Sequence, residues 1–422
     1  MRLSDTLTRG PAELPEPPGP VRMYFCGPTV YARAHIGNAR PFVFGMWLRN
    51  WLRNRGYDVT LVHNITDVDD KIIAAPGPSA EVAARAAQWY IEDVGDLGLG
   101  MPDGMPRATE AIPSIVEFIE ALVGQGFAYA VQGDVYFRVS RDPSYGRLSG
   151  QRPDQVEEQE PNPYKEDPRD FALWKGQKPG EDLVWESPWG PGRPGWHIEC
   201  SVMAEEAFGP VFEIHGGGLD LVFPHHENEL AQSRALGHEF ARIWAHNGML
   251  EFTGEKMSKS LGNDTSLRNV LDTWGRETVL LFFLRGHWRK PIDFNDETLA
   301  SAAARAEGFR DVFRAPSVTA PEGSWERFAA ALDDDFNTPE ALAVMHEWRD
   351  HELLRRALEV FGLESLAELP EAPPEVVELA RERARARAER RFDDADELRR
   401  GIEEAGWIVR DSDVEFQLVP KS

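Results

Sequence analysis

Two apolar runs on either side of one amphipathic segment restrict what this chain can fold into. The first run spans Val21 to Cys26, and the second spans Asp58 to His63 and ends at Asn64. Between them, apolar residues recur at helical spacing from about Gly37 to Arg55, and the pattern stops at Gly56. A strand, a helix and a strand in so short a stretch form a βαβ unit, in which the two strands are parallel. The sequence therefore predicts a doubly wound α/β domain.

The carboxyl ends of these strands are where we expect a ligand, because open parallel sheets bind ligands at that edge. Cys26 and Thr66 fall at these ends, as does the turn His35-Ile36-Gly37-Asn38 that opens the predicted helix. A helix N-terminus attracts anions, since its first N–H groups are unpaired and its dipole is positive there. The turn therefore suggests an anion site, although four such residues also occur in ordinary turns.

Side chains that ligate zinc occur in widely separated parts of the chain. Cys200 offers a thiolate, and His225 and Glu229 offer an imidazole and a carboxylate that lie on one face of a helix. His226 is three residues before Glu229 and would also reach, so the spacing favours His225 only modestly. The only other cysteine, Cys26, is the fourth candidate ligand. The hypothesis is therefore a zinc ion held by Cys26, Cys200, His225 and Glu229. The alternative is that the thiols are simply buried and the histidines are solvated.

A second candidate for phosphate binding is the loop Lys256-Met257-Ser258-Lys259-Ser260-Leu261-Gly262-Asn263. Each lysine ammonium is a point charge with three donors, so two of them in a Ser/Gly-rich loop suit a mobile clamp on polyphosphate. A solvated loop explains the same residues equally well.

Composition limits the class of protein. The 422 residues allow two to four domains, and 42% hydrophobic with 28% charged residues is typical of a soluble globular protein. No apolar run approaches the roughly 20 residues that span a bilayer. The N-terminus lacks an apolar signal core, and two cysteines make no disulfide framework. We therefore expect a cytoplasmic protein with no membrane segment.

The net charge of −25 argues against general affinity for nucleic acid, which needs clustered Lys and Arg. One stretch differs, because a predicted last helix from about Pro374 contains six arginines: Arg381, Arg383, Arg385, Arg387, Arg390 and Arg391. A local basic surface and a surface helix of mixed charge both explain this stretch.

The remaining segments suggest an order of parts. Residues 1–20 form a proline-rich lead-in, residues 83–128 are helical in pattern, and residues 296–362 are mostly helical. From Asp134 to about Gly190 the composition shifts to short strands and turns, which predicts an insertion within the α/β domain. Ile243 to Leu250 is expected to be a further strand.

Seven motifs in order resemble a known family. They are FCGPTVY (25–31), HIGN (35–38), NITDVDDKI (64–72), GRPGWHIECS (192–201), HGGGLDLVFPHHENE (215–229), KMSKSLGN (256–263) and ALDDDFNTPEAL (331–342). Together they resemble the cysteinyl-tRNA synthetases, a family of class I aminoacyl-tRNA synthetases, and the likeness covers nearly the whole chain. One short motif is only suggestive, whereas seven in the family's order are highly specific.

The resemblance implies roles for particular residues. Cys26, Cys200, His225 and Glu229 match the family's zinc ligands, which resolves the choice between His225 and His226. The cysteine pocket is matched at Thr66 and Trp196, and the signatures that handle ATP are matched at His35, Gly37, Asn38, Lys256 and Lys259. Further substrate contacts are implied at Gly27 and Thr29.

Two departures from the family's pattern stand out. The usual final histidine of the HIGH signature is Asn38 here, and asparagine can donate a hydrogen bond to a phosphate but cannot carry a positive charge. The segment between residues 313 and 375 also looks short for the family, which bears on how the helical bundle grips tRNA.

The family's architecture sets the expected division of the chain. It implies a Rossmann-like doubly wound parallel sheet with an α/β insertion, followed by a helical bundle and a small C-terminal domain. The expected segments are 1–95 and 191–255 for the catalytic domain, 96–190 for the insertion, 256–300 for the KMSKS loop and stem-contact region, 301–375 for the bundle, and 376–422 for anticodon recognition.

The implied activity is that of a cysteine–tRNA ligase working as a monomer. Its substrates would be L-cysteine, ATP with Mg²⁺ and tRNA(Cys), and one Zn²⁺ would recognise the substrate thiol. The cysteine carboxylate would attack the α-phosphate of ATP, and the terminal ribose of the tRNA would then take the aminoacyl group. Two alternatives are the cysteine ligase of mycothiol biosynthesis, which uses glucosaminyl-inositol, and a catalytically silent paralogue that binds tRNA or zinc.

Overall fold

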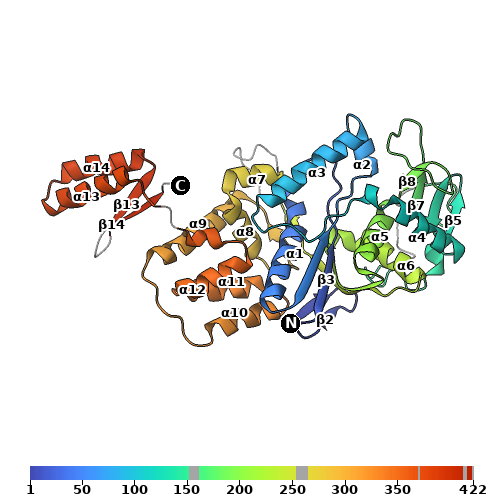
Figure 1. The fold of residues 1–422 in the computed structure, drawn as a ribbon, viewed down its shortest axis with the longest axis horizontal. Helices are drawn as coiled ribbons and strands as arrows, with labels where there is room; N and C mark the ends of the chain where they lie inside the picture. Colours follow the sequence, from blue (N-terminus) through green and yellow to red (C-terminus); the bar gives the residue numbers. More distant parts are fainter. Residues whose placement is uncertain (152–160, 253–264, 369–370, 412–415, 421–422) are drawn as a thin grey trace.

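A computed structural model describes residues 1–151, 161–252, 265–368, 371–411 and 416–420 of the chain. Figure 1 shows its parts side by side along the long axis. A small antiparallel sheet lies at one end, followed by the central sheet with its helices, a group of helices, and a C-terminal unit at the other end. Among the described residues, no helix combines the length and the apolar composition that crossing a bilayer requires.

The central sheet has the strand order β10-β9-β3-β4, and all of its strand pairs are parallel. Its strands are β3 (Pro20–Phe25), β4 (Asp58–His63), β9 (Val211–Gly218) and β10 (Phe240–Asn247). β3 pairs with β4 on one side and with β9 on the other, so the strand order reverses at β3. Such a reversal is where open α/β sheets bind their ligands.

The predicted βαβ unit is confirmed, and α1 (Ile36–Asn54) connects β3 to β4. The helix begins at a capping box: His35 Nδ1 accepts from the Gly37 N–H at 3.1 Å, and Asn38 Oδ1 accepts from the His35 N–H at 3.1 Å. Beyond its end, Gly56 has a φ of 87°, a left-handed conformation that glycine adopts without a side-chain clash.

The side chains of β3 alternate between two cores, as the pleat of a strand requires. Val21, Met23 and Phe25 pack with α1 and with later helices. Tyr24 and Cys26 instead belong to a second core, which includes residues of α5 (Trp196–Phe208) and α6 (Glu227–Ala235). Cys26 is therefore on the face of the sheet that α5 and α6 cover.

Between β4 and α5 the chain builds several helices and a second sheet. Helices come first: α2 (Asp70–Ile73), α3 (Ser79–Gly95) and α4 (Ile112–Gly124). An antiparallel sheet follows, in the order β5 (Ala128–Val131), β6 (Asp134–Phe137), β7 (Phe171–Gly176) and β8 (Gly192–Pro194). The strands begin before Asp134, because β5 is too short for its alternation to stand out from the helical pattern before it.

Helices dominate residues 267–360, as predicted for much of this range. They are α7 (Leu267–Trp274), α8 (Arg276–Leu284), α9 (Asp296–Arg314), α10 (Ser324–Asp333), α11 (Thr338–Glu347) and α12 (His351–Val360). Two short parallel strands, β11 (Leu250–Glu251) and β12 (Ile292–Asp293), join the end of the α/β domain to this group. Trp47 of α1 donates to the Phe361 carbonyl at 2.9 Å, so α1 packs between the sheet and these helices.

The two ends of the chain differ from the prediction. The proline-rich lead-in contains an antiparallel pair, β1 (Arg2–Asp5) with β2 (Gly10–Glu13). The prediction that all six arginines lie on one last helix is wrong. The helix α13 (Pro374–Ala388) ends before Arg390, whose φ is 62°.

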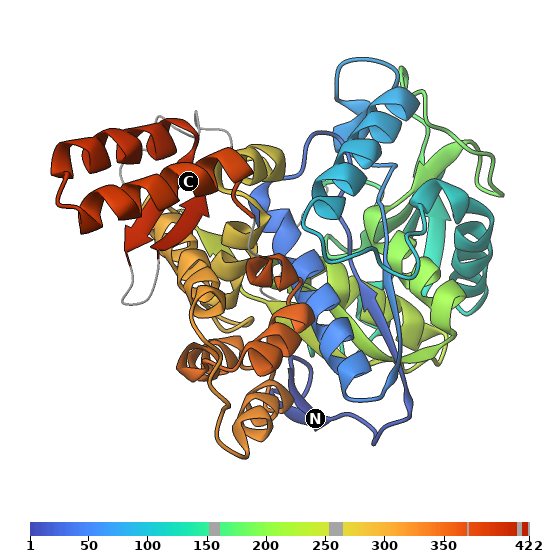
Figure 2. The same ribbon diagram turned by 60° about the vertical axis from the view of Figure 1, so that its left-hand side comes forward.

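A second helix and a strand pair complete the C-terminal unit: α14 (Phe392–Glu404), β13 (Trp407–Asp411) and β14 (Phe416–Pro420). This unit has a small core of its own and lies beside the group of helices, away from the insertion sheet (Figures 1 and 2). Arg383 and Arg387 both pair with Asp411, and Arg385 pairs with Glu378 at 3.0 Å. These pairs neutralise part of the basic stretch.

Candidate metal centre and nucleotide cavity

The four predicted zinc ligands come together from three separate parts of the fold. Cys26 directly follows β3, Cys200 lies on α5, and His225 lies in a short segment, kinked at Phe223, that leads into α6, which carries Glu229. All four are buried, and their candidate ligand atoms lie within 4.8 Å of one another. The structure thus brings together two cysteines that the sequence places far apart.

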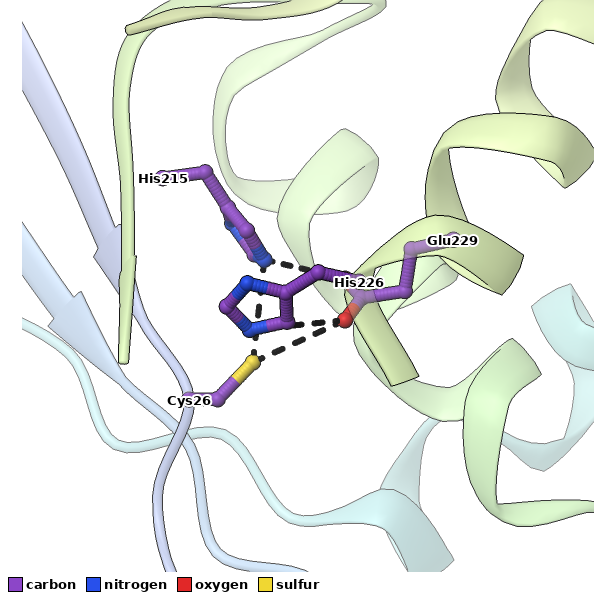
Figure 3. Close-up of side chains that lie close together, drawn as sticks. All are labelled: Cys26, His215, His226 and Glu229. Carbon is purple, nitrogen blue, oxygen red and sulfur yellow. Dashed lines mark hydrogen bonds and ion pairs between the residues drawn. The ribbon is translucent and has the colours of Figure 1, made fainter. Parts of the chain in front are cut away.

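A second set of ligand atoms overlaps the first. Cys26, His215, His226 and Glu229 also lie within 4.8 Å of one another, and Figure 3 shows both imidazoles beside the Cys26 sulfur and the Glu229 carboxylate. The Nε2 atoms of His215 and His225 are each 3.7 Å from the Cys26 sulfur. The two sets share Cys26 and Glu229, so His226, which the spacing left open, is also close to the centre.

The Glu229 carboxylate faces both sets. Its Oε1 lies 3.0 Å from His225 Nε2, and its Oε2 lies 3.1 Å from His215 Nε2. The distance from Oε1 to His226 Nε2 is longer, at 3.9 Å. His226 has another partner, because its Nδ1 lies 2.7 Å from His246 Nε2, and His246 Nδ1 contacts the Thr6 hydroxyl at 2.8 Å.

The chemistry of these groups fits a divalent cation. Burial raises the pKa of the Cys26 thiol and of the Glu229 carboxyl well above their usual values. Burial also lowers the pKa of His225 well below its usual value and that of His215 to about 3. All of these groups therefore favour their uncharged forms in the protein alone. A cation reverses this preference for thiols and carboxyls, and the donor set of sulfur, imidazole and carboxylate matches zinc.

Trp196 lies beside the candidate metal centre. Its indole stacks on the His225 ring, with centroids 4.3 Å apart and planes 21° apart. The preceding Gly195 has no room for a side chain, because a Cβ there would lie 2.0 Å from the Ala172 carbonyl oxygen. This close approach of β7 to the start of α5 fixes where Trp196 enters the site.

Asn64 connects the metal centre to Thr66. Its Oδ1 accepts from the Gly27 N–H at 2.9 Å and lies 3.7 Å from the Cys200 sulfur. Its Nδ2 donates to the Thr66 hydroxyl at 3.2 Å. Thr66 is buried, and its carbonyl accepts from the Val30 N–H at 3.0 Å. Thr66 is thus connected to the candidate ligand Cys200 through the Asn64 side chain.

A cavity of about 470 Å³ runs along the carboxyl edge of the sheet. Its walls include most of the predicted binding residues: Cys26, Gly27, Thr29, His35, Gly37, Asn38 and Trp196. Thr66 does not line this cavity in the part of the chain that the structure describes. The cavity therefore extends from Cys26, one of the candidate metal ligands, to the N-terminus of α1.

The N-terminus of α1 differs from the prediction in one respect. Its first N–H groups are not unpaired: Ile36 donates to the Thr265 carbonyl at 2.8 Å, Gly37 to His35 Nδ1, and Asn38 to the His35 carbonyl at 2.8 Å. The capping box and the neighbouring loop already satisfy these donors. An anion here would depend on the helix dipole and on side-chain donors, including the amide NH₂ of Asn38.

The two lysines of the predicted phosphate clamp, Lys256 and Lys259, lie outside the described residues. Their roles stay predictions.

Several neighbours of the candidate metal centre have no role in the sequence-based prediction, among them Asn64, His197 and His215. His197 is three residues before Cys200, so helical spacing alone could have placed it on the same face of α5. His215 lies opposite Tyr24 across the β3–β9 pair. That pairing joins residues far apart in the sequence, so no local pattern reveals it.

Comparisons with protein families extend over the described fold. Residues 14–304 match the model of the tRNA synthetases class I (C) catalytic domain, and residues 327–359 match the DALR domain. Residues 369–417 match the cysteinyl-tRNA ligase anticodon binding domain.

Individual proteins give the same result. The chain is 42% identical over 460 aligned residues to a cysteine–tRNA ligase of Brevibacillus brevis, covering 98% of each chain. It is 45% identical over 437 residues to one of Alkalilimnicola ehrlichii, covering 94% of each. Among solved structures, it resembles Mycobacterium tuberculosis methionyl-tRNA synthetase in complex with methionyl-adenylate at a TM-score of 0.59 and 15% identity, covering 82% of this chain and 88% of that one.

The last likeness concerns the fold alone. The catalytic-domain match and the full-length likeness to named ligases show the family as well as the fold. On this evidence, the chain belongs to the cysteine–tRNA ligase family of class I aminoacyl-tRNA synthetases, and it is an aminoacyl-tRNA ligase.

Proposed function

We propose that this protein activates L-cysteine with ATP, as its Mg²⁺ complex, and transfers the cysteinyl group to tRNA(Cys). The observation that carries the proposal is the single cavity that joins Cys26 and Trp196 to the first turn of α1. It allows the amino acid at one end to meet the α-phosphate of ATP at the other. The anticodon-binding match over residues 369–417 supports tRNA, rather than an amino-sugar, as the acceptor.

The chain's own residues would act by positioning the substrates and offsetting their charge. Trp196, Gly27 and Thr29 would form the walls around the amino acid, and Thr66 would support them through Asn64. The phosphates would lie at the first turn of α1, where His35, Gly37 and Asn38 face the cavity. Lys256 and Lys259 would also bind the phosphates and close over ATP.

The proposed metal ligands are Cys26, Cys200, His225 and Glu229, and the proposed ion is Zn²⁺. Bound there, the ion would supply a soft Lewis acid that favours a thiolate over the hydroxyl of serine, a distinction that a purely apolar pocket makes poorly. This set contains two thiols, whereas the set with His215 and His226 contains one. The additional thiol supports the first set, because few biological metal ions other than zinc prefer thiolate ligands.

The activity is tested by ATP–pyrophosphate exchange that depends on cysteine, followed by transfer to tRNA(Cys) or to glucosaminyl-inositol. We expect exchange with cysteine and not with serine, and transfer to tRNA alone. Transfer to the amino-sugar would contradict the proposal, and so would the absence of any exchange by metal-loaded protein.

The ligand set is tested by Cys200→Ser beside His226→Gln. We expect Cys200→Ser to weaken zinc binding and to raise the KM for cysteine far more than the KM for ATP. His226→Gln should retain most of the zinc affinity, because it belongs to the other set. If His226→Gln instead weakened zinc binding more than Cys200→Ser, the ion would be assigned to the set with His215 and His226. If Cys200→Ser raised both KM values equally, the metal would have only a structural role.

We also propose that the protein acts as a monomer in the cytoplasm. Light scattering on purified protein, alone and with tRNA, tests the first point. Fractionation of cells tests the second.

A further inference from the structure

The imidazoles of His197 and His225 meet through the same type of ring nitrogen. Their Nδ1 atoms lie 3.1 Å apart. The other nitrogen of His225, Nε2, faces the metal centre, 3.7 Å from the Cys26 sulfur and 3.0 Å from Glu229 Oε1. The two nitrogens of His225 thus face two different partners. Because a neutral imidazole carries one proton, a proton on Nδ1 leaves Nε2 with a free lone pair, and the reverse.

A contact of this kind requires one proton between the two Nδ1 atoms. Two protons would point at each other, and no proton would leave two lone pairs facing each other. If His225 carries the proton at Nδ1, its Nε2 has a lone pair that can bind a cation. If His197 carries the proton instead, the neutral His225 ring is protonated at Nε2 and cannot bind a cation through that atom.

We propose that His197 is a positioning residue that accepts the Nδ1–H of His225 and so holds the His225 Nε2 lone pair ready for the metal. The inference depends on the proposed ligand set of Cys26, Cys200, His225 and Glu229. Metal-binding histidines generally donate their second N–H to such an acceptor, and loss of the acceptor weakens metal binding.

The surroundings hold His197 where this role requires. It follows Trp196 in the first turn of α5, and the Trp196 indole stacks on the His225 ring. The ring of Phe171 meets His197 edge-on, with centroids 5.7 Å apart and planes 84° apart. Trp196, His197 and Phe171 also line a separate cavity of about 170 Å³. Aromatic contacts from α5 and β7 therefore restrict both imidazoles to the geometry of the Nδ1 contact.

Two substitutions separate hydrogen bonding from packing. His197→Phe keeps a ring but removes the acceptor. His197→Asn places an acceptor, Oδ1, the same number of bonds from Cα as the histidine Nδ1. A matched control is His238→Phe, because His238 Nδ1 contacts Glu205 at 2.9 Å outside the metal centre.

The measurement is the zinc affinity of the full-length protein in competition with a chromophoric chelator. We expect His197→Phe to weaken zinc binding about 10- to 100-fold. His197→Asn should recover most of the loss, and His238→Phe should match the wild type. Nitrogen-15 spectra of histidine-labelled, zinc-loaded protein should show a proton on His225 Nδ1.

The outcomes distinguish this inference from the proposed ligand set. Wild-type affinity in His197→Phe, with weak binding in Cys200→Ser, would overturn the role of His197 and keep the ligands. Equal losses in His197→Phe and His197→Asn would also overturn it, because packing would then be the cause. If Cys200→Ser binds zinc as the wild type does, the ligand set itself is wrong.

Discussion

The Asn64 side chain accepts a hydrogen bond from the Gly27 N–H, 2.9 Å away, just after Cys26 leaves the sheet. Asn64 is fully buried, so Asn64→Ala would leave this N–H without a partner. We expect a loss of about 1–3 kcal/mol in the free energy of unfolding and weaker zinc binding. Urea denaturation and chelator competition measure the two effects. Asn50→Ala is the control, because the Asn50 amide makes only a 3.4 Å contact with the Val360 carbonyl, and equal losses would contradict the prediction.

Gly27 itself has no space for a side chain. A Cβ there would lie 1.7 Å from the backbone oxygen of Asn64, whereas a Cβ at Gly10 would meet nothing within 4 Å. We therefore expect Gly27→Ala to destabilise the protein by about 2 kcal/mol or more, since backbone must shift to admit the methyl group. Gly10→Ala should have little effect. Melting temperatures compare the two variants, and a wild-type value for Gly27→Ala would show that the approach is looser than described.

Asn38 combines a structural and a proposed binding role, and two substitutions separate them. Asn38→Asp keeps the oxygen that accepts from the His35 N–H, but it loses the NH₂ group and adds negative charge near the proposed phosphates. We expect Asn38→Asp to retain stability and to lower the rate of pyrophosphate exchange tenfold or more. Asn38→Ala should also lose about 1 kcal/mol of stability with the cap. Full exchange activity in Asn38→Asp would exclude a phosphate contact.

Arg22 and Glu213 should make stability depend on pH. Arg22 donates to both Glu213 carboxylate oxygens at 2.9 Å and thereby ties β3 to β9. Burial acts to raise the pKa of Glu213, but hydrogen bonds from the Arg22 guanidinium and backbone N–H outweigh it and hold the pKa below 4.5. The carboxylate therefore stabilises the fold fully above about pH 5, and this contribution is lost as pH falls through the folded-state pKa.

Glu213→Gln tests this expectation. At neutral pH we expect it to lower the free energy of unfolding by about 2 kcal/mol. The difference from the wild type should shrink in acid, where the wild-type carboxyl also loses its charge. Urea denaturation at several pH values measures the difference in the free energy of unfolding. A difference that stays constant with pH would contradict the role assigned to the charged Glu213 carboxylate.

Local patterns were sufficient for the central βαβ unit. β4 spans Asp58–His63 as predicted, and α1 spans Ile36–Asn54, because a buried parallel strand and a helix with an apolar stripe leave distinct periodicities. Shorter elements were missed. The four-residue strands β1 and β2 give too few alternations, and the apolar spacing of α13 does not show that the chain turns at Arg390.

The candidate metal centre shows the same limit at the level of side chains. Residue types and helical spacing suggested Cys200, His225 and Glu229, but they left His226 open. The contacts of His197 and Asn64 depend on how α5, β4 and the turn before α6 pack together. His215 depends on the β3–β9 pairing. Only the assembled fold reveals such neighbours.

The insertion that carries β5 to β8 lies between Cys26 and Cys200 in the sequence but builds a sheet of its own. Its strand β7 nevertheless packs against the start of α5, where the Ala172 carbonyl leaves no room for a side chain at Gly195. Insertions or deletions between the two cysteines therefore leave the thiols in place only where they spare β7. The segment is a wall of the site as well as a connection between the sulfurs.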